Sequence, residues 1–204
     1  PLSWYQDNNV GLIQEEVERL QLPQAADDWV VLATGTRPKA LEIPGGHHAR
    51  SLHSAADAAW ISEVLESGMF GQRVLVIGAG LVGAEFASTA KMLGAQVTLV
   101  SSSNAPLAHV LGQELAEQLH ADHANHGITT VTGAVTELGP NHTLVNGQRH
   151  EAELIVAAIG VEPETALAEQ LGLEVDDGIL VDAQQRSLSC PQVLAIGDAA
   201  REEN

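Results

Sequence analysis

A glycine-rich turn between two apolar segments constrains this sequence more than any other feature. The glycines follow the spacing Gly78-x-Gly80-x-x-Gly83. The apolar run at 73–77 precedes them and has the composition of a parallel strand that is buried on both faces. Residues 81–100 then have the pattern of a helix followed by a second apolar strand. Strand, glycine turn, helix and strand in this order predict a Rossmann-type βαβ unit that binds a dinucleotide.

Each glycine of this turn has a physical reason. In a dinucleotide site, Gly78 makes the tight turn, Gly80 lets the backbone approach the pyrophosphate, and Gly83 lets helix and strand pack closely. The first N–H groups of the following helix are free to donate to phosphate oxygens. We therefore expect the whole turn to bind the cofactor, that is Gly78, Ala79, Gly80, Leu81, Val82 and Gly83. The alternative is a βαβ unit in which the glycines serve only the turn.

The end of the second strand bears on the choice between NAD and NADP. An acidic residue that binds the ribose hydroxyls is expected there, about 20 residues after the glycines. The sequence instead has Ser101, Ser102, Ser103 and Asn104, without an acid and without an arginine for a 2′-phosphate. Serine hydroxyls can hydrogen-bond to a ribose, whereas an extra dianion would need a cation. We therefore assign Ser101 and Ser102 to the cofactor site and expect NAD rather than NADP.

Composition and charge argue against several classes of partner. The 204 residues carry a formal net charge of −18, from 27 acidic residues against 9 Lys plus Arg. Nucleic acids and anionic membranes need a basic face that replaces their counterions, so we expect neither as a partner. The acids are scattered, which favours a role in solubility over a docking face for a basic partner. The sequence has no apolar run of roughly 18 residues, and Cys190 is its single cysteine. We therefore expect a cytoplasmic location.

The rest of the sequence alternates strand and helix patterns, which is typical of an α/β fold. We expect further helices at 54–65, 110–125 and 165–171, the first with Ser54 as its N-cap and Gly68 as its stop. Strands are predicted at 9–13, 16–20, 28–33, 128–131, 134–138, 142–145, 153–159, 179–182 and 192–198, with a hairpin turn at Asn146-Gly147. The fold class is therefore α/β with a parallel Rossmann sheet.

Three spaced blocks make the sequence similar to the FAD-dependent pyridine nucleotide-disulfide oxidoreductases, the superfamily of the disulfide reductases and of the ferredoxin and rubredoxin reductases. The blocks are residues 31–38 (VLATGTRP), 76–85 (VIGAGLVGAE) and 192–198 (QVLAIGD), and residues 158–163 (AIGVEP) resemble the family's hinge out of the NAD domain. Their order and spacing cover nearly the whole chain. Residues 53–58 (HSAADA) resemble the corresponding stretch of ferredoxin and rubredoxin reductase-like enzymes, and the CxxC of thioredoxin reductases is absent there.

The resemblance implies an α/β fold in which a Rossmann-type NAD(P)-binding domain, residues 46–160, is inserted in a partial FAD-binding domain, residues 1–45 and 161–204. It also implies that the family's first FAD-binding GxGxxG unit lies upstream of Pro1 and its interface domain downstream of Asn204. We accordingly expect this chain alone to bind FAD poorly, to be inactive as an isolated fragment, and to have any oligomer interface outside it.

The same resemblance implies further residues that bind the cofactors. They are Thr34, Gly35, Arg37, Glu85, Gly160, Gly197 and Asp198. The Thr34-Gly35 turn would lie near the flavin dinucleotide, and Asp198 would accept a hydrogen bond from its ribityl chain. Glu85 would lie near the nicotinamide, with Gly160 against the cofactor on the other side. Asp198 also follows a buried strand and a glycine, where α/β sheets place ligands; its alternative is a turn aspartate that caps a helix.

The implied activity is hydride transfer from NADH to FAD, with electrons then passed to a ferredoxin or rubredoxin type of acceptor. Glu85 is expected to position the substrate, and neither a catalytic acid or base nor a metal site is expected. Two alternatives stay open: an NADH oxidase, peroxidase or disulfide reductase of the same superfamily, and a non-catalytic NAD-binding module. Cys190 is interpreted as a turn residue, and His120, His123 and His126 as a solvated helix end rather than a metal site.

Overall fold

The computed structural model describes residues 2–68 and 72–203, and the chain divides into two compact units. We name Arg37–Glu162 the inserted unit, and Pro1–Thr36 together with Pro163–Asn204 the flanking unit. Each unit has buried hydrophobic clusters of its own. None of the helices in the described parts of the chain is both long and apolar enough to cross a membrane.

The division between the units falls within a pair of strands. Strand β2 (Thr36–Pro38) pairs with β11 (Val161–Pro163), and each strand contributes residues to both units. Residues 37–45 group with the inserted unit, in which Leu41 and Ile43 pack against buried core residues.

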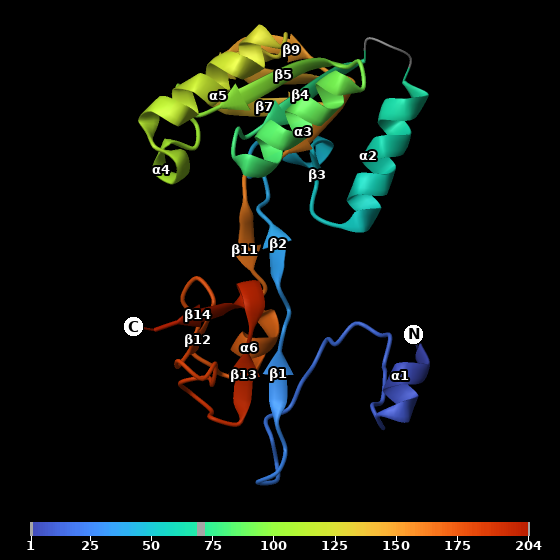
Figure 1. The fold of residues 1–204 in the computed structure, drawn as a ribbon, viewed down its shortest axis with the longest axis vertical. Helices are drawn as coiled ribbons and strands as arrows, with labels where there is room; N and C mark the ends of the chain where they lie inside the picture. The colour runs from blue at the N-terminus through green and yellow to red at the C-terminus, as the bar shows by residue number, and fades with distance from the viewer. Residues whose placement is uncertain (1, 69–71, 204) are drawn as a thin grey trace. The chain divides into compact units, whose positions relative to one another are not determined.

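A five-stranded parallel sheet forms the centre of the inserted unit (Figure 1). From edge to edge its strands are β3 (Arg50–Ser51), β10 (Leu154–Ala157), β4 (Arg73–Ile77), β5 (Gln96–Ser101) and β6 (Thr129–Thr132), and a short 3-10 helix, η1 (Gly46–His48), precedes β3. Residues 74–77 of β4 are all buried, as the apolar sequence predicts for a strand covered on both faces. The predicted α/β class with a parallel Rossmann-type sheet is confirmed.

Two helices cover one face of this sheet. They are α2 (Ala55–Ser67) and α3 (Leu81–Met92). Ile61 of α2 and Phe86 of α3 belong to one buried cluster with Val76 of the central strand. The helical spacing of apolar residues in the sequence therefore corresponds to the faces that these helices bury.

Helix α2 begins with the cap that its sequence predicts. The Ser54 hydroxyl accepts a hydrogen bond from the Asp57 N–H at 3.1 Å, and the Asp57 carboxylate accepts one from the Ser54 N–H at 2.8 Å. This reciprocal pair is a capping box. The hydrogen bonds from Ser54 also hold the pKa of Asp57 below its usual value.

The prediction of one continuous helix at 110–125 is wrong. The structure has two helices here, α4 (Ala108–Leu111) and α5 (Gln113–Asn125). Gly112 separates them with φ = 81°, which no residue within an α-helix adopts. The apolar periodicity runs across both helices, so the pattern alone does not reveal the break.

An antiparallel sheet covers the other face of the parallel sheet. Its strands are β7 (Val135–Gly139), β8 (His142–Val145) and β9 (Gln148–Glu151). Asn146 and Gly147 connect the last two with φ of 51° and 77°, as a two-residue hairpin turn requires. Leu138 and Val145 are buried against residues of β4, β5 and β10. The inserted unit thus has three layers: helices, parallel sheet and antiparallel sheet.

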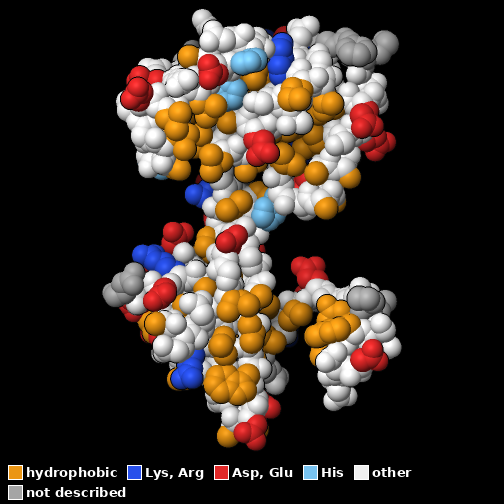
Figure 2. Space-filling view, in the orientation of Figure 1, with side chains coloured by type: hydrophobic (Ala, Val, Ile, Leu, Met, Phe, Trp, Pro, Cys, Tyr) orange, Lys and Arg blue, Asp and Glu red, His pale blue; other side chains and the backbone are white. Residues whose placement is uncertain are grey.

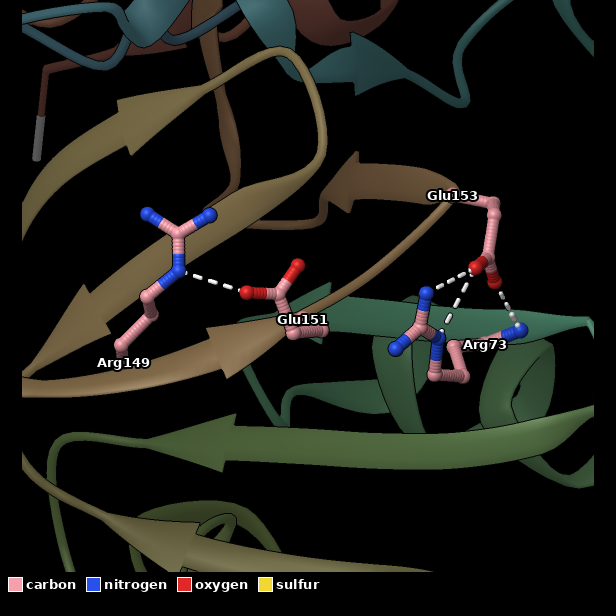
Figure 3. Close-up of polar contacts among 4 residues, drawn as sticks. All are labelled: Arg73, Arg149, Glu151 and Glu153. Carbon is pink, nitrogen blue, oxygen red and sulfur yellow. Dashed lines mark hydrogen bonds and ion pairs between the residues drawn. The ribbon is translucent and has the colours of Figure 1, made fainter.

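Figure 3 shows two ion pairs of the inserted unit, one at the start of β4 and one on β9. The Arg73 guanidinium and its backbone N–H both bind the Glu153 carboxylate, the latter at 2.6 Å, and Arg149 Nε lies 2.5 Å from Glu151 Oε1. Each arginine holds the pKa of its partner carboxyl below the usual value. The Arg73 contact ties the start of β4 to the residue before β10, which fixes the alignment of two neighbouring strands.

The flanking unit is built from short paired segments. In chain order its elements are α1 (Leu2–Asp7), β1 (Val30–Leu32), α6 (Ala166–Gln170), β12 (Ile179–Val181), β13 (Val193–Ala195), the 3-10 helix η2 (Gly197–Ala199) and β14 (Ala200–Glu202). β1 pairs with β13, and β12 with β14, both in parallel. Leu32, Ile179 and Val193 share one buried cluster that joins these pairs.

The two strands predicted at 9–13 and 16–20 are wrong. The described chain has neither helix nor strand between α1 and β1, and large apolar side chains there are exposed, Ile13 at 78%. An alternating pattern forms a strand only where another strand accepts its backbone hydrogen bonds. No described strand pairs with this segment.

Candidate nucleotide-binding site

The glycine turn lies where β4 ends and α3 begins. Gly78 has φ = 102°, which a residue with a side chain rarely adopts. A Cβ on it would lie 2.3 Å from the Ala158 carbonyl oxygen, and its N–H donates to the Val100 carbonyl at 2.9 Å. The structure of the chain itself therefore requires glycine at this position.

Gly83 has a different role, in the first turn of α3. A Cβ on it would lie 1.9 Å from the Gly78 carbonyl oxygen and 3.2 Å from the Ala158 Cβ. Glycine thus allows the start of α3 to lie directly against the end of the parallel sheet.

Gly80 differs from both, because nothing in the described chain requires it. A Cβ on this residue would have no atom within 4 Å, and its φ of −71° is open to any residue. The space beside it is what a pyrophosphate needs in order to approach the backbone. Of the three glycines, Gly80 is thus the one that packing within the described chain does not explain.

Helix α3 presents free N–H groups at this turn. Its N-cap is Gly80, which provides no side-chain cap, and the first helical hydrogen bond runs from the Ala84 N–H to the Gly80 carbonyl at 2.9 Å. The N–H groups of the residues between them have no acceptor within the helix. Together with the positive end of the helix dipole, they form a site for a phosphate anion.

A cavity of about 850 Å³ opens at this turn. The predicted site residues that line it are Gly78, Ala79, Gly80, Leu81, Val82, Ser101, Ser102 and Gly160, whereas Gly83 and Glu85 do not. Sequence reasoning missed residues 51–53, 105–110 and 157–159, which also line the cavity. They follow or end β3, β5 and β10, and the carboxyl ends of parallel strands meet at one edge of a sheet.

None of the described residues that line this cavity carries a carboxylate. Among its described residues the titratable side chains are His53 and His109, although the chain has a formal net charge of −18. A dinucleotide carries its negative charge on the pyrophosphate, and nearby carboxylates would repel it. The cavity therefore has the size, the phosphate-binding helix end and the charge that such a ligand needs.

The serines at the end of β5 are not equivalent. Ser101 is 4% exposed, and its hydroxyl donates to the Ser103 carbonyl at 2.7 Å and accepts from the Ser103 N–H at 3.1 Å. That hydroxyl stabilises the local turn. Ser102 is exposed at the same cavity, so it is the serine better placed to meet a ribose.

Glu85 lies beside a second, smaller cavity of about 250 Å³ between α2 and α3. Leu52 and Val82 line both cavities, which places the two side by side. Hydrophobic side chains form patches on the face of the inserted unit that carries α3 (Figure 2), where Leu81 and Val82 are exposed. Glu85 is thus about one helical turn from the N-terminal end of α3, beside a cavity with a largely apolar lining.

In the flanking unit, residues predicted to bind FAD come together at one edge. β1 and β13 are parallel, so the Thr34-Gly35 turn and the Gly197-Asp198 turn follow neighbouring strand ends. The Ile196 N–H donates to the Leu32 carbonyl at 3.0 Å, which continues the pairing to this edge. Both glycines have φ of 67° and open space at the Cβ position.

The structure also shows the contacts of Thr34, Asp198 and Arg37. The Thr34 hydroxyl donates to the Glu164 carbonyl at 2.6 Å, and Asp198 is exposed in η2. Arg37 belongs to the inserted unit, where its Nε lies 2.9 Å from Glu162 Oε1. The structure therefore places Thr34, Gly35, Gly197 and Asp198 after neighbouring strand ends of the flanking unit, and Arg37 forms an ion pair with Glu162 within the inserted unit.

The structure also shows the surroundings of Cys190 and of the histidines on α5. Cys190 is half-buried against the core of the flanking unit. The interpretation as a solvated helix end is wrong for His123, which is 6% exposed on α5, and this burial lowers its pKa. Among the residues that the structure describes, no three His, Cys, Asp or Glu side chains are grouped to hold a metal ion.

Known proteins are similar to this chain in sequence and fold. The family model of the pyridine nucleotide-disulphide oxidoreductases matches residues 4–204. The nitric oxide reductase FlRd-NAD(+) reductase of Aeromonas hydrophila subsp. hydrophila is 32% identical over 197 residues, which cover 92% of this chain and 50% of that protein. The chain spans about half the length of the curated relatives it matches.

Two solved structures are similar over most of the chain. A ferredoxin reductase from Rhodopseudomonas palustris superposes with a TM-score of 0.86 at 28% identity, covering 100% of this chain and 54% of that one. The covalent putidaredoxin reductase–putidaredoxin complex gives a TM-score of 0.80 at 31% identity, covering 87% and 45%. The sequence match, the fold and the glycine turn together show that this chain belongs to the pyridine nucleotide-disulphide oxidoreductase family.

Proposed function

We propose that this chain is the nicotinamide-nucleotide-binding part of an FAD-dependent NAD(P)H oxidoreductase. The observation that carries the proposal is Gly80, whose lack of a side chain no contact within the described chain explains. It stands at the free N-terminal end of α3 and lines a cavity whose described lining residues include no carboxylate. These three features together suit the pyrophosphate of a dinucleotide.

In this proposal the residues of the inserted unit bind and orient the nucleotide. The N–H groups at the start of α3 hold the phosphates, and Gly80 allows their close approach. Ser102 meets the ribose at the end of β5, and residues 157–160 form the opposite wall. Glu85, one turn into α3, positions the nicotinamide end. The bound pair of cofactors supplies hydride transfer from NADH to FAD.

The flanking unit would hold part of the FAD. The turns at Thr34-Gly35 and Gly197-Asp198 lie at one edge and have room for close approach of a ligand at both glycines. Asp198 is exposed there and is suited to accept a hydrogen bond from a ribityl hydroxyl. We expect this chain alone to bind FAD poorly, and purification with stoichiometric flavin would contradict that expectation.

The electron acceptor that we propose is a small carrier of the ferredoxin or rubredoxin type. The names of the similar proteins support this choice, since they include a FlRd-NAD(+) reductase, a ferredoxin reductase and a complex with putidaredoxin. An NADH oxidase, a peroxidase or a disulfide reductase of the same family is the second candidate. A protein that binds NADH without reducing its flavin would instead be a non-catalytic nucleotide-binding module.

Binding of NADH to the 204-residue chain tests the proposal, measured by isothermal titration calorimetry. Gly80→Ala puts a methyl group in the space proposed for the pyrophosphate, and we expect the Kd to rise about tenfold or more. The matched control is Gly11→Ala, which also meets no atom within 4 Å but lies in the flanking unit. Equal NADH affinity in the wild type and in Gly80→Ala would overturn the proposal.

A further inference from the structure

The cavity lacks the group that commonly excludes NADP. In NAD sites a carboxylate after the second strand binds the ribose hydroxyls, and it would repel the phosphate that distinguishes NADP. At the end of β5 the cavity is lined by Ser101, Ser102 and Ser103, and none of its described lining residues is Asp or Glu. Among the described lining residues, no carboxylate therefore opposes a 2′-phosphate at this strand end.

A side chain that can donate hydrogen bonds lines the same cavity, a few residues after the serines in the chain. His109 is exposed on α4, which follows the serines in the chain. Leu107, the N-cap of α4, is 7% exposed and has φ = 70°, a rare conformation for a residue with a branched side chain. Its burial anchors α4, so that residues 105–110 form a wall of the cavity.

The other histidine of the lining belongs to a different region. His53 follows β3, and the sheet order β3-β10-β4-β5 puts two strands between β3 and β5. Among the described lining residues, His109 is therefore the titratable side chain that accompanies the serines after β5. Its ring nitrogens can donate to phosphate oxygens, as an arginine does in NADP sites.

We infer that this site accepts NADPH as well as NADH, and that Ser102 and His109 set the ratio of the two affinities. The inference rests on the proposed nucleotide-binding function and adds its specificity. The Ser102 hydroxyl donates to either a ribose hydroxyl or a 2′-phosphate, and His109 donates to the phosphate only. The missing arginine predicts a preference for NAD. His109, which follows the end of β5 in the chain, reduces this preference.

Titration of the 204-residue chain with NADH and, separately, NADPH tests this inference by calorimetry. For the wild type we expect the two Kd values to agree within about tenfold. Ser102→Asp installs the carboxylate and should raise the Kd of NADPH at least tenfold relative to that of NADH. His109→Ala should raise the Kd of NADPH several-fold and leave that of NADH unchanged.

The control is Gln118→Glu, which adds the same charge on an exposed position of α5 outside the cavity and should leave the ratio of affinities unchanged. Thermal unfolding of each variant shows that it is folded. A wild-type preference for NADH of more than tenfold, or an unchanged ratio in both Ser102→Asp and His109→Ala, would overturn the inference while leaving the proposed function standing. Failure of both nucleotides to bind would overturn the proposed function itself.

Discussion

Replacing Gly83 with alanine would place a methyl carbon 1.9 Å from the Gly78 carbonyl oxygen. Ordinary van der Waals contact begins at 3.4 Å, so this carbon would lie 1.5 Å too close. The clash is with backbone rather than with the end of a flexible side chain, so α3 must move away from the end of β4. Overpacking costs about 1–3 kcal/mol, and we expect about 3 kcal/mol for an overlap of this size. In a chain of this length, that lowers the Tm by roughly 6–12 °C.

Urea unfolding followed by far-ultraviolet circular dichroism, together with thermal unfolding, measures this effect. Gly80→Ala is the matched control, because the same methyl group three residues earlier meets no atom within 4 Å. We expect that variant to stay within about 0.5 kcal/mol of the wild type. If Gly83→Ala unfolds at the wild-type midpoint, the close packing of α3 against the end of β4 is refuted.

Ser54→Ala removes the N-cap of α2 and should cost about 1 kcal/mol in urea unfolding, whereas Ser54→Asn should restore most of it; equal stabilities would contradict the capping role. Burial lowers the pKa of His123 in the folded protein. Below about pH 6.5 the unfolded chain is therefore protonated at this histidine, whereas the folded protein stays neutral there until a lower pH. Stability should therefore fall as the pH drops from about 7 through 6.5 towards the folded pKa, and His123→Gln should show a shallower decline of the urea midpoint. Arg73 lowers the pKa of Glu153 in the folded protein. The ionised carboxylate therefore contributes fully to the stability of the fold above about pH 4.3, and this contribution is lost as the pH falls through the folded pKa. Glu153→Gln should flatten the acid limb of the stability profile, and an unchanged limb would count against the ion pair.

Much of the inserted unit is predictable from sequence because its signals are local. An apolar run of strand length, a serine followed three residues later by an acid, and an asparagine-glycine turn each restrict the backbone within a few residues. Strand β4, the capped start of α2 and the turn between β8 and β9 accordingly have the predicted positions. The fold class follows from their order, since strands that alternate with helices form a parallel sheet.

Predictions failed where the outcome depends on distant residues. The alternating pattern of residues 9–20 has no described strand to pair with, so it stays irregular. Most of its apolar side chains are exposed, and Leu20 alone packs partly against the core of the flanking unit. The helix expected at 110–125 is interrupted at Gly112, whose positive φ is one of several conformations that glycine allows. A local pattern permits these conformations but does not choose among them.

The sequence by itself determined the glycine turn, because the turn depends on backbone conformations and missing side chains within six consecutive residues. Only the tertiary structure separated the roles of its glycines: Gly78 and Gly83 are enclosed by neighbouring atoms, whereas Gly80 faces open space. Tertiary structure also decided that Ser101 turns its hydroxyl to the backbone and that His109 lines the cavity. These facts depend on which strand ends meet at one edge of the sheet, and that arrangement is set by packing of the whole unit rather than by any short stretch of sequence.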